Sequence, residues 1–268
     1  MNDFSEDYIL GGRLLLRQPR RGHRFGHDAI LLAAACPARP GDYAVDLGAG
    51  VGAAGLALAS RVPGLSVTLV EIDPELAALA QENARRNGFS ERVRTVTLDV
   101  AASARAFVEA GLDAGSASRV LMNPPFHDQT RQTASPDRGR ALAHSASGPT
   151  LGAWVATATR LLRPGGTLTL IWRPDDLLDV ITALAKAFGG TAVLPVHPKP
   201  GRNAIRILVR AIKGSRAPLE LLPGLMLNDA AAQPTPEAQA ILRNGGTLAL
   251  AEDISPADLG ARPDEKLP

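Results

Sequence analysis

The sequence is poor in cysteine, in long apolar runs and in net charge. Cys36 is the single cysteine, which excludes an intrachain disulfide framework and a cysteine metal cluster, so we expect no bound metal. The apolar runs are far shorter than a membrane span, and the acidic N-terminus has no signal-peptide core, so we expect a cytoplasmic protein without a membrane partner. Lysine and arginine exceed the acids by only two residues, so composition alone does not indicate nucleic-acid binding.

Three glycines at alternate positions follow a short apolar stretch near residue 45. The stretch 43–46 ends in Asp46, and the turn Gly48-Ala49-Gly50-Val51-Gly52 leads into an alanine- and leucine-rich segment with helical character up to Arg61. Strand, glycine turn and helix predict the first βα unit of an open parallel sheet, where glycines let the backbone approach a nucleotide.

Acids end the next two expected strands. The stretch 66–73 contains Glu71 and Ile72 at its end, where a carboxylate can accept hydrogen bonds from ribose hydroxyls. The stretch 92–98 is followed by Asp99 and Val100, and Asp99 is placed to accept from an exocyclic amine such as adenine N6. With the helix expected over 74–88, the pattern predicts an α/β fold.

The glycine turn by itself leaves more than one ligand open. Gly50 to Gly55 matches the dinucleotide pattern G-x-G-x-x-G, and Glu71 lies about twenty residues further on, as a nicotinamide enzyme requires. Asp46 argues against that interpretation, because a carboxylate beside the ligand repels a pyrophosphate and suits the cationic methionine part of S-adenosylmethionine. A turn that binds no ligand is the third alternative.

The expected strand 118–122 runs directly into Asn123-Pro124-Pro125-Phe126. Two prolines fix the backbone and cannot donate, so the carbonyl of Pro124 and the side-chain carbonyl of Asn123 can accept both hydrogens of one planar amine. Phe126 offers a ring on which an extruded base can stack. This motif predicts methylation of an exocyclic amino group.

Basic residues form two strips on either side of this unit. We expect Asp28 to cap the helix 28–36 and to place its tip over the ligand. The strips contain seven residues that we expect to bind RNA phosphates: Arg20, Arg21, Arg24, Arg202, Arg206, Lys213 and Arg216. A solvated charged face is the alternative for the strips. The polar segment 127–150 is expected to form a substrate lid or a mobile loop.

Residues 25–212 resemble the class I S-adenosylmethionine-dependent methyltransferases, since Asp46 to Gly50, Glu71, Asp99 and Asn123 to Phe126 match four of their motifs in order. The resemblance implies a Rossmann-like fold with helices on both faces of a mostly parallel seven-stranded sheet and an antiparallel closing strand. It also implies S-adenosylmethionine as the cofactor, held by Asp28, Asp46, Gly48, Ala49, Gly50, Gly52, Glu71, Ile72, Asp99, Val100 and Asn123.

The flanks 10–20, 24–35 and 211–218 resemble the bacterial tRNA1(Val) adenine N6-methyltransferases, which modify the adenine just 3′ of the anticodon. That family often has tyrosine where this chain has Phe126, so a hydrogen bond from the ring is lost and stacking is kept. The resemblance implies tRNA as the substrate and three parts: a basic N-terminal extension (1–40), the methyltransferase domain (41–216) and a C-terminal extension (217–268) with a disordered end.

Related enzymes remain as alternatives. Release-factor glutamine methyltransferases also use Asn-Pro-Pro on a planar amide, but they have a helical substrate domain before the cofactor motif, where this chain has only a basic segment of about forty residues. Guanine N2 enzymes of ribosomal RNA are longer, and DNA adenine enzymes need a recognition domain for which this chain has no room. A non-catalytic RNA- or nucleotide-binding module is disfavoured by the intact Asn123 motif.

Overall fold

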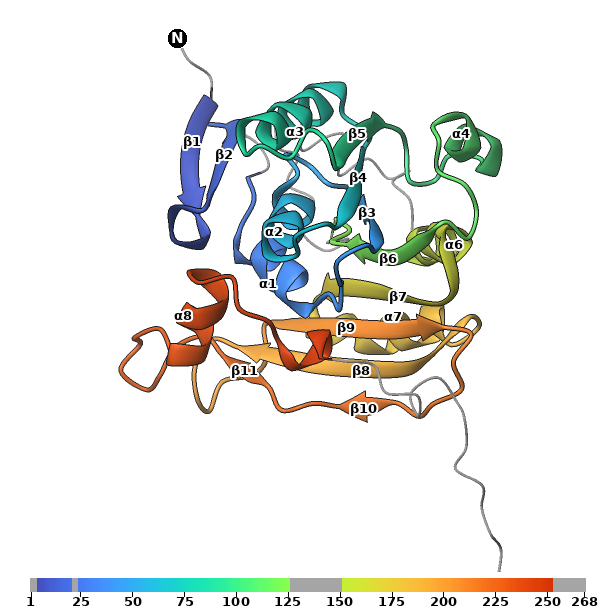
Figure 1. The fold of residues 1–268 in the computed structure, drawn as a ribbon. Coiled ribbons are helices and arrows are strands. Elements are labelled where there is room, and N and C mark those ends of the chain that lie inside the picture. The colour runs from blue at the N-terminus through green and yellow to red at the C-terminus, as the bar shows by residue number, and fades with distance from the viewer. Residues whose placement is uncertain (1–3, 21–23, 126–150, 253–268) are drawn as a thin grey trace, which may run out of the picture.

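The computed structural model describes residues 4–20, 24–125 and 151–252, and its centre is a mixed β-sheet (Figure 1). Seven strands make up that centre: β3 (Tyr43–Leu47), β4 (Ser66–Glu71), β5 (Val93–Thr97), β6 (Ala117–Met122), β7 (Leu162–Trp172), β8 (Phe188–His197) and β9 (Arg206–Lys213). Their order is β5-β4-β3-β6-β7-β9-β8, and β9 alone runs antiparallel to its neighbours. The expected parallel sheet and its closing antiparallel pair are therefore confirmed.

The sheet is wider than the seven strands expected from the sequence. Two short strands, β10 (Glu220–Leu221) and β11 (Leu225–Met226), pair in parallel with the outer edge of β8 and bring the sheet to nine strands. The β7 strand has a register shift against β6 between Ala117 and Arg119. The segment from Arg163 to Gly166 is the irregular start of β7.

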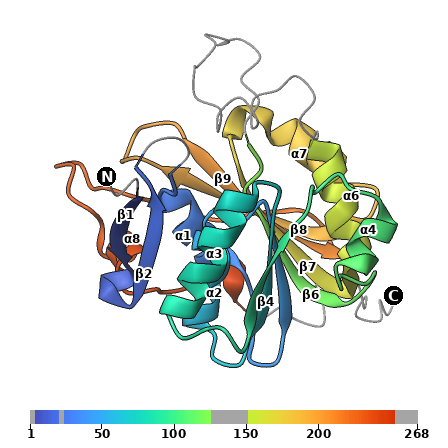
Figure 2. The ribbon, with the colours of Figure 1, turned by 90° about the horizontal axis from the view of Figure 1, so that it is seen from above.

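Helices cover both faces of the sheet, each over its own apolar cluster. One face is covered by α1 (His27–Ala35), α2 (Ala53–Arg61) and α3 (Pro74–Arg86), and the other by α4 (Ala104–Glu109), α6 (Leu151–Leu161) and α7 (Leu177–Leu184), as Figure 2 shows. Alternate residues of β9 supply the two clusters, Leu208 to the first and Ile207 and Val209 to the second. Within the described ranges, no helix has the length and apolar character needed to cross a bilayer.

The N-terminal residues form a separate antiparallel hairpin that is held to the domain by two asparagines. Its strands are β1 (Phe4–Ile9) and β2 (Leu14–Pro19), joined by the 3-10 helix Leu10–Gly12. Asn87, the C-cap of α3, accepts from the N–H of Leu15 (2.9 Å) and donates to its carbonyl (2.7 Å). Asn83 likewise accepts from the N–H of Arg17 (2.8 Å) and donates to its carbonyl (2.9 Å). The two side-chain amides thus make the hydrogen bonds with β2 that a neighbouring strand would make.

Asn83 makes one contact that Asn87 lacks. Its side chain is fully buried, and Nδ2 also donates to the carbonyl of Val51 in the glycine turn (3.0 Å). We expect Asn83→Ala to lower the free energy of unfolding by about 2–3 kcal/mol, because one buried and two partly buried backbone groups lose their partners. The matched control is Asn87→Ala, for which we expect a loss of about 1 kcal/mol in the free energy of unfolding. Urea denaturation measures the loss in both variants. Equal losses for both variants would contradict a special role of the Val51 contact.

The described part of the C-terminal extension is built into the first apolar cluster. After β11, the helix α8 (Pro236–Leu242) and the 3-10 helix Ala249–Ala251 lie against α1 (Figure 1). The N–H of Leu248 donates to the carbonyl of Ala34 (2.9 Å), and the guanidinium of Arg210 on β9 donates to that of Leu250 (3.2 Å). The last described residue is 252, so the end of the extension, which was expected to be disordered, lies outside the described residues.

Candidate functional site

Strand register brings the sequence motifs to one edge of the sheet. Leu47 of β3 pairs with Val70 of β4 on one side and with Met122 of β6 on the other. The residues that follow these three positions, Gly48, Glu71 and Asn123, therefore lie side by side at the carboxyl ends of the strands. In open α/β sheets this edge is where ligands bind.

The glycine turn has a conformation that side chains would not tolerate. Gly48, Gly50 and Gly52 have φ values of 67°, 56° and 85°, in the left-handed region that glycine adopts without steric cost. A Cβ on Gly48 would overlap the indole of Trp154 from α6, whereas a Cβ on Gly50 would meet open space. The turn is therefore packed on its inner side at Gly48 and open at Gly50, where a ligand can approach the backbone.

Glu71 holds the open side of this turn. Its buried carboxylate accepts from the N–H of Gly50 at 2.7 Å and from the N–H of Asp73 at 3.0 Å. A carboxylate offers about four acceptor positions, so two remain for the hydroxyls of a ribose. The next side chain, Ile72, is 53% exposed although it is apolar, which suits the face of an adenine ring.

The turn after β5 completes this side of the edge. Asp99 is partly exposed and accepts from the N–H of Ala101 (2.8 Å), which leaves acceptor capacity on its carboxylate. Val100 is buried, and its carbonyl accepts from the hydroxyl of Thr157 on α6 (2.8 Å). Together with Glu71, Ile72 and the turn at Gly50, these residues fit the ribose and adenine of S-adenosylmethionine.

Asp46 departs from its expected place. Only 2% of the residue is exposed, and its carboxylate lies beneath the turn, where it accepts from the N–H of Gly55 in α2 (2.8 Å). In this arrangement Asp46 supports the turn from below, and its expected contact with a cationic ligand stays a prediction. Burial raises the pKa of the Asp46 carboxyl from 3.8 to about 7, the Gly55 hydrogen bond opposes this rise, and the charge of Glu71 adds to it.

This raised pKa gives stability a definite pH dependence. The folded state keeps the Asp46 proton at pH values where the unfolded chain has lost it, so the free energy of unfolding falls as pH rises from about 4 to about 7, by up to about 4 kcal/mol. Urea midpoints measured across this range should fall in wild type. In Asp46→Asn, which keeps an acceptor for Gly55, the fall should be much smaller, and an unchanged profile in that variant would contradict the assignment.

Asn123 and the two prolines leave the end of β6 directly beside Gly48. Pro124 is buried, and Asn123 and Pro125 are half-buried. Within the described part of the chain, no hydrogen bond engages the Asn123 side chain, so its carbonyl and that of Pro124 have acceptor capacity for a substrate amine. Phe126 and the expected lid 127–150 lie outside the described residues.

Asp28 is the second expected site residue whose contacts differ from those expected. The cap of α1 is Gly26, and Asp28 lies in the first turn of the helix, where its carboxylate accepts from Nε of Arg206 at 2.8 Å. The expected capping role is therefore wrong. The ion pair instead ties the start of α1 to the start of β9.

The basic strips separate into two groups. Arg202 and Arg206 lie at the edge that holds Asn123, because β9 begins there, whereas Lys213 and Arg216 lie at the opposite edge. Lys213 donates to the carbonyls of Thr159 (2.7 Å) and Leu162 (2.6 Å), so its expected RNA contact is corrected to a structural role.

The N-terminal arginines have local partners. Arg20 donates to the carbonyl of Phe4 at 3.1 Å, and Arg24 pairs with Asp7 at 3.2 Å, but both residues stay exposed. Arg21 lies outside the described residues.

The sequence did not single out Arg173, His197 or Ile205, which line a pocket at the same edge. Arg173 directly follows the strand that ends at Trp172, and position after a strand was the signal that identified Glu71 and Asp99. His197 and Ile205 border a loop between antiparallel strands, for which no comparable signal exists.

Comparison with known proteins gives three concordant findings. A family model described as Methyltransferase small domain matches residues 24–199. A tRNA1(Val) (adenine(37)-N6)-methyltransferase of Porphyromonas gingivalis is 30% identical over 190 residues, which make up 69% of this chain and 72% of that protein. A release factor glutamine methyltransferase of Chlorobaculum tepidum is 25% identical over 207 residues, 75% of this chain and 69% of that protein.

Among solved structures, the crystal structure of a predicted O-methyltransferase, protein Atu636 from Agrobacterium tumefaciens, has 33% sequence identity and a TM-score of 0.69. The match covers 82% of this chain and 98% of that chain.

Proposed function

The chain belongs to the methyltransferase small-domain family, and from this premise we propose that it methylates the exocyclic N6 amine of an adenine in tRNA, at the position next to the anticodon. It is an S-adenosylmethionine-dependent methyltransferase with the class I fold. The observation that supports the amine is the placement of Asn123 and Pro124 beside Gly48. The adenine and the tRNA are supported by relatives whose names specify them, at 30–33% identity.

The residues of this chain have three tasks in the proposed reaction. S-adenosylmethionine supplies, when bound, an electrophilic methyl group. Glu71, Asp99 and the turn at Gly50 hold its ribose and adenine, while Asn123 and Pro124 each accept one hydrogen of the substrate amine. This arrangement points the nitrogen lone pair towards the glycine turn and removes the freedom that the amine has in water. The nitrogen that gains a methyl group becomes acidic and loses its extra proton to water.

The substrate base must leave its stack to reach this site, as in other enzymes that modify a base. We place Phe126 as the ring on which it stacks, and Arg20, Arg21, Arg24, Arg202 and Arg206 as contacts to RNA phosphates. Arg216 is no longer part of this proposal, since it lies at the opposite edge of the sheet.

A protein substrate is the second candidate, because the glutamine methyltransferase of Chlorobaculum tepidum matches three quarters of this chain. Its target is an amide whose NH2 group is planar like that of adenine, and the same two carbonyls could accept its hydrogens.

Labelling with tritiated S-adenosylmethionine distinguishes the candidates. The purified protein is incubated with separate pools of tRNA, ribosomal RNA and protein from a strain that lacks the gene, so that target sites are unmodified. Label in tRNA that digests to N6-methyladenosine is the expected result. Label in protein, or N2-methylguanosine from ribosomal RNA, would overturn the substrate and keep the methyltransferase chemistry.

A further inference from the structure

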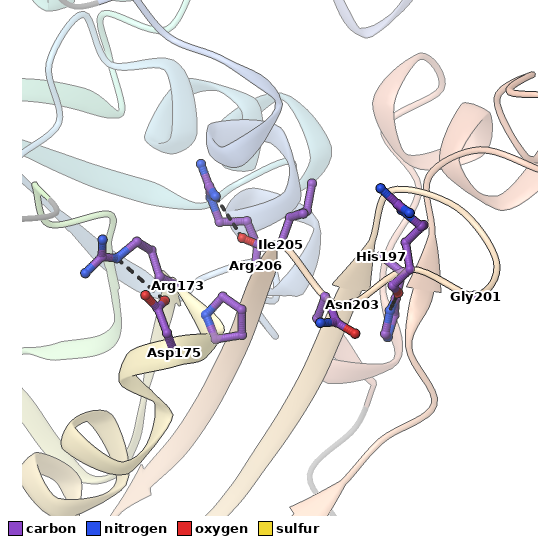
Figure 3. A pocket seen from close by; sticks show the side chains of 10 residues that line it. Arg173, Asp175, His197, Gly201, Asn203, Ile205 and Arg206 are labelled. Carbon is purple, nitrogen blue, oxygen red and sulfur yellow. Dashed lines mark hydrogen bonds and ion pairs between the residues drawn. The ribbon is translucent and has the colours of Figure 1, made fainter. Parts of the chain in front are cut away.

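A pocket of about 820 Å³ opens beside the catalytic edge, between the end of β7 and the loop that joins β8 to β9 (Figure 3). Arg173 and Asp175 lie on one side, His197 and Gly201 on the other, and Asn203 between them. The volume is within the range of pockets that bind small molecules or single nucleotides. The proposed reaction uses two residues of its lining, Arg202 and Arg206, as contacts to RNA phosphates, but it assigns no ligand to the pocket itself.

The loop over residues 198–205 is held in place by its own hydrogen bonds. The carbonyl of Arg202 is 2.8 Å from Nδ1 of His197, whose N–H donates to it. Asn228 donates twice to the carbonyl of Pro198, through its backbone N–H (3.1 Å) and its side chain (3.0 Å). Gly201 adopts a φ of 70°, which allows the tight turn. The pocket wall is therefore formed before a ligand binds.

The charged groups of the pocket lining are three arginines and the carboxylate of Asp175, which lies 3.7 Å from Arg173. Arg173 pairs with Asp176 at 2.9 Å, and Arg206 pairs with Asp28 at 2.8 Å. Arg202 is exposed, and within the described residues no carboxylate lies against its guanidinium. The pocket thus has a cation available for an anionic ligand and, in Ile205 (43% exposed), an apolar surface next to it.

The pocket is close to the catalytic motif. Leu170 of β7 pairs with Met122, the residue before Asn123, and Trp172, the residue before Arg173, pairs with Ile207 at the start of β9. From β6 to β9 is two strand spacings, about 10 Å. A chain whose base is extruded at Asn123 therefore reaches the pocket within a neighbouring nucleotide or two.

We propose that this pocket binds a nucleotide of the substrate RNA that flanks the methylated base, with its phosphodiester on Arg202 and its base against Ile205. The inference rests on the proposed function, since it takes single-stranded RNA as the substrate. Phosphate charge matches Arg202, and a base face matches an exposed apolar side chain at the rim of a preformed pocket.

Binding of a fluorescein-labelled anticodon stem–loop RNA, measured by anisotropy over a series of salt concentrations, tests the pocket without any turnover. We expect Arg202→Gln to weaken binding about fivefold and to reduce the slope of log K against log salt by about 0.7, the value for one lost phosphate contact in a single strand. Ile205→Ser should weaken binding with the slope unchanged, because no charge is removed. Arg216→Gln, an exposed arginine at the opposite edge, is the matched control and should bind like wild type.

Each outcome is decisive. If Arg202→Gln kept the RNA affinity and the salt slope of wild type, the proposal that the pocket binds RNA would be contradicted. An equal loss of affinity in Arg216→Gln would also contradict it, because it would indicate general electrostatic attraction. The labelling assay is run on the same preparations. If Arg202→Gln loses a phosphate contact but wild type labels no RNA, the pocket stands as an RNA site and the proposed reaction fails. If wild type labels tRNA and Arg202→Gln binds normally, only the pocket fails.

Discussion

Asn123→Ala should lower kcat for methyl transfer about a thousandfold, a loss of about 4 kcal/mol in transition-state stabilisation. The reason is that the variant removes one of the two carbonyls that orient the substrate amine at the end of β6. Single-turnover methylation of unmodified tRNA measures the rate, and calorimetry with S-adenosylmethionine measures cofactor binding, which should change little.

The proposed role of Asn123 needs both results together. If cofactor affinity fell as much as the rate, Asn123 would be a cofactor-binding residue and the amine-orienting role would be contradicted. Asn123→Asp provides a matched variant, because it keeps a carbonyl-type oxygen at the same distance from the backbone. It should retain more activity than Asn123→Ala, and equal loss in the two variants would argue that the amide has another function.

Gly48→Ala should destabilise the fold by about 3 kcal/mol, the second large effect that we expect. The new methyl group combines two costs: a left-handed backbone at a φ of 67° and overlap with the buried indole of Trp154. The urea midpoint and the melting temperature of the variant measure this loss.

Gly50→Ala separates the two costs. Its φ of 56° is similar, but its Cβ would meet open space, so the unfolding free energy should fall by only about 1–2 kcal/mol. The methyl group would, however, lie where the cofactor approaches the turn. Calorimetry should therefore show strongly weakened binding of S-adenosylmethionine. If Gly50→Ala bound the cofactor like wild type, the open side of the turn would not be the cofactor side.

Local patterns predicted the sheet and the places of the main motifs. Gly48, Glu71, Asp99 and Asn123 were each found because they lie at or just after the end of an expected strand, and strand ends in a parallel sheet meet at one edge. The division into three parts at residues 40 and 216 stays a prediction, as do the roles of the site residues.

Long-range contacts account for what the sequence did not predict. Asp46 precedes the turn in the chain, but whether its side chain faces the ligand or lies beneath depends on the packing of α2, where Gly55 donates to it. Asp28 has the residue type of a helix cap, yet its partner Arg206 is 178 positions away. Lys213 and Arg202 belong to one basic stretch, and only the direction of β9 places them at opposite edges.

The insertion of β9 between β7 and β8 has a consequence for synthesis of the chain on the ribosome. β8 is made before β9, but among the described strands it pairs only with β9 and with the later β10 and β11, so none of these partners exists when β8 emerges. The outer edge of β7 also stays unpaired until β9 has been made, and the side of α1 that packs against α8 and the 3-10 helix Ala249–Ala251 stays uncovered until these follow. Most of the chain must therefore be synthesised before the sheet closes, and the unpaired edges are open to misassociation until then.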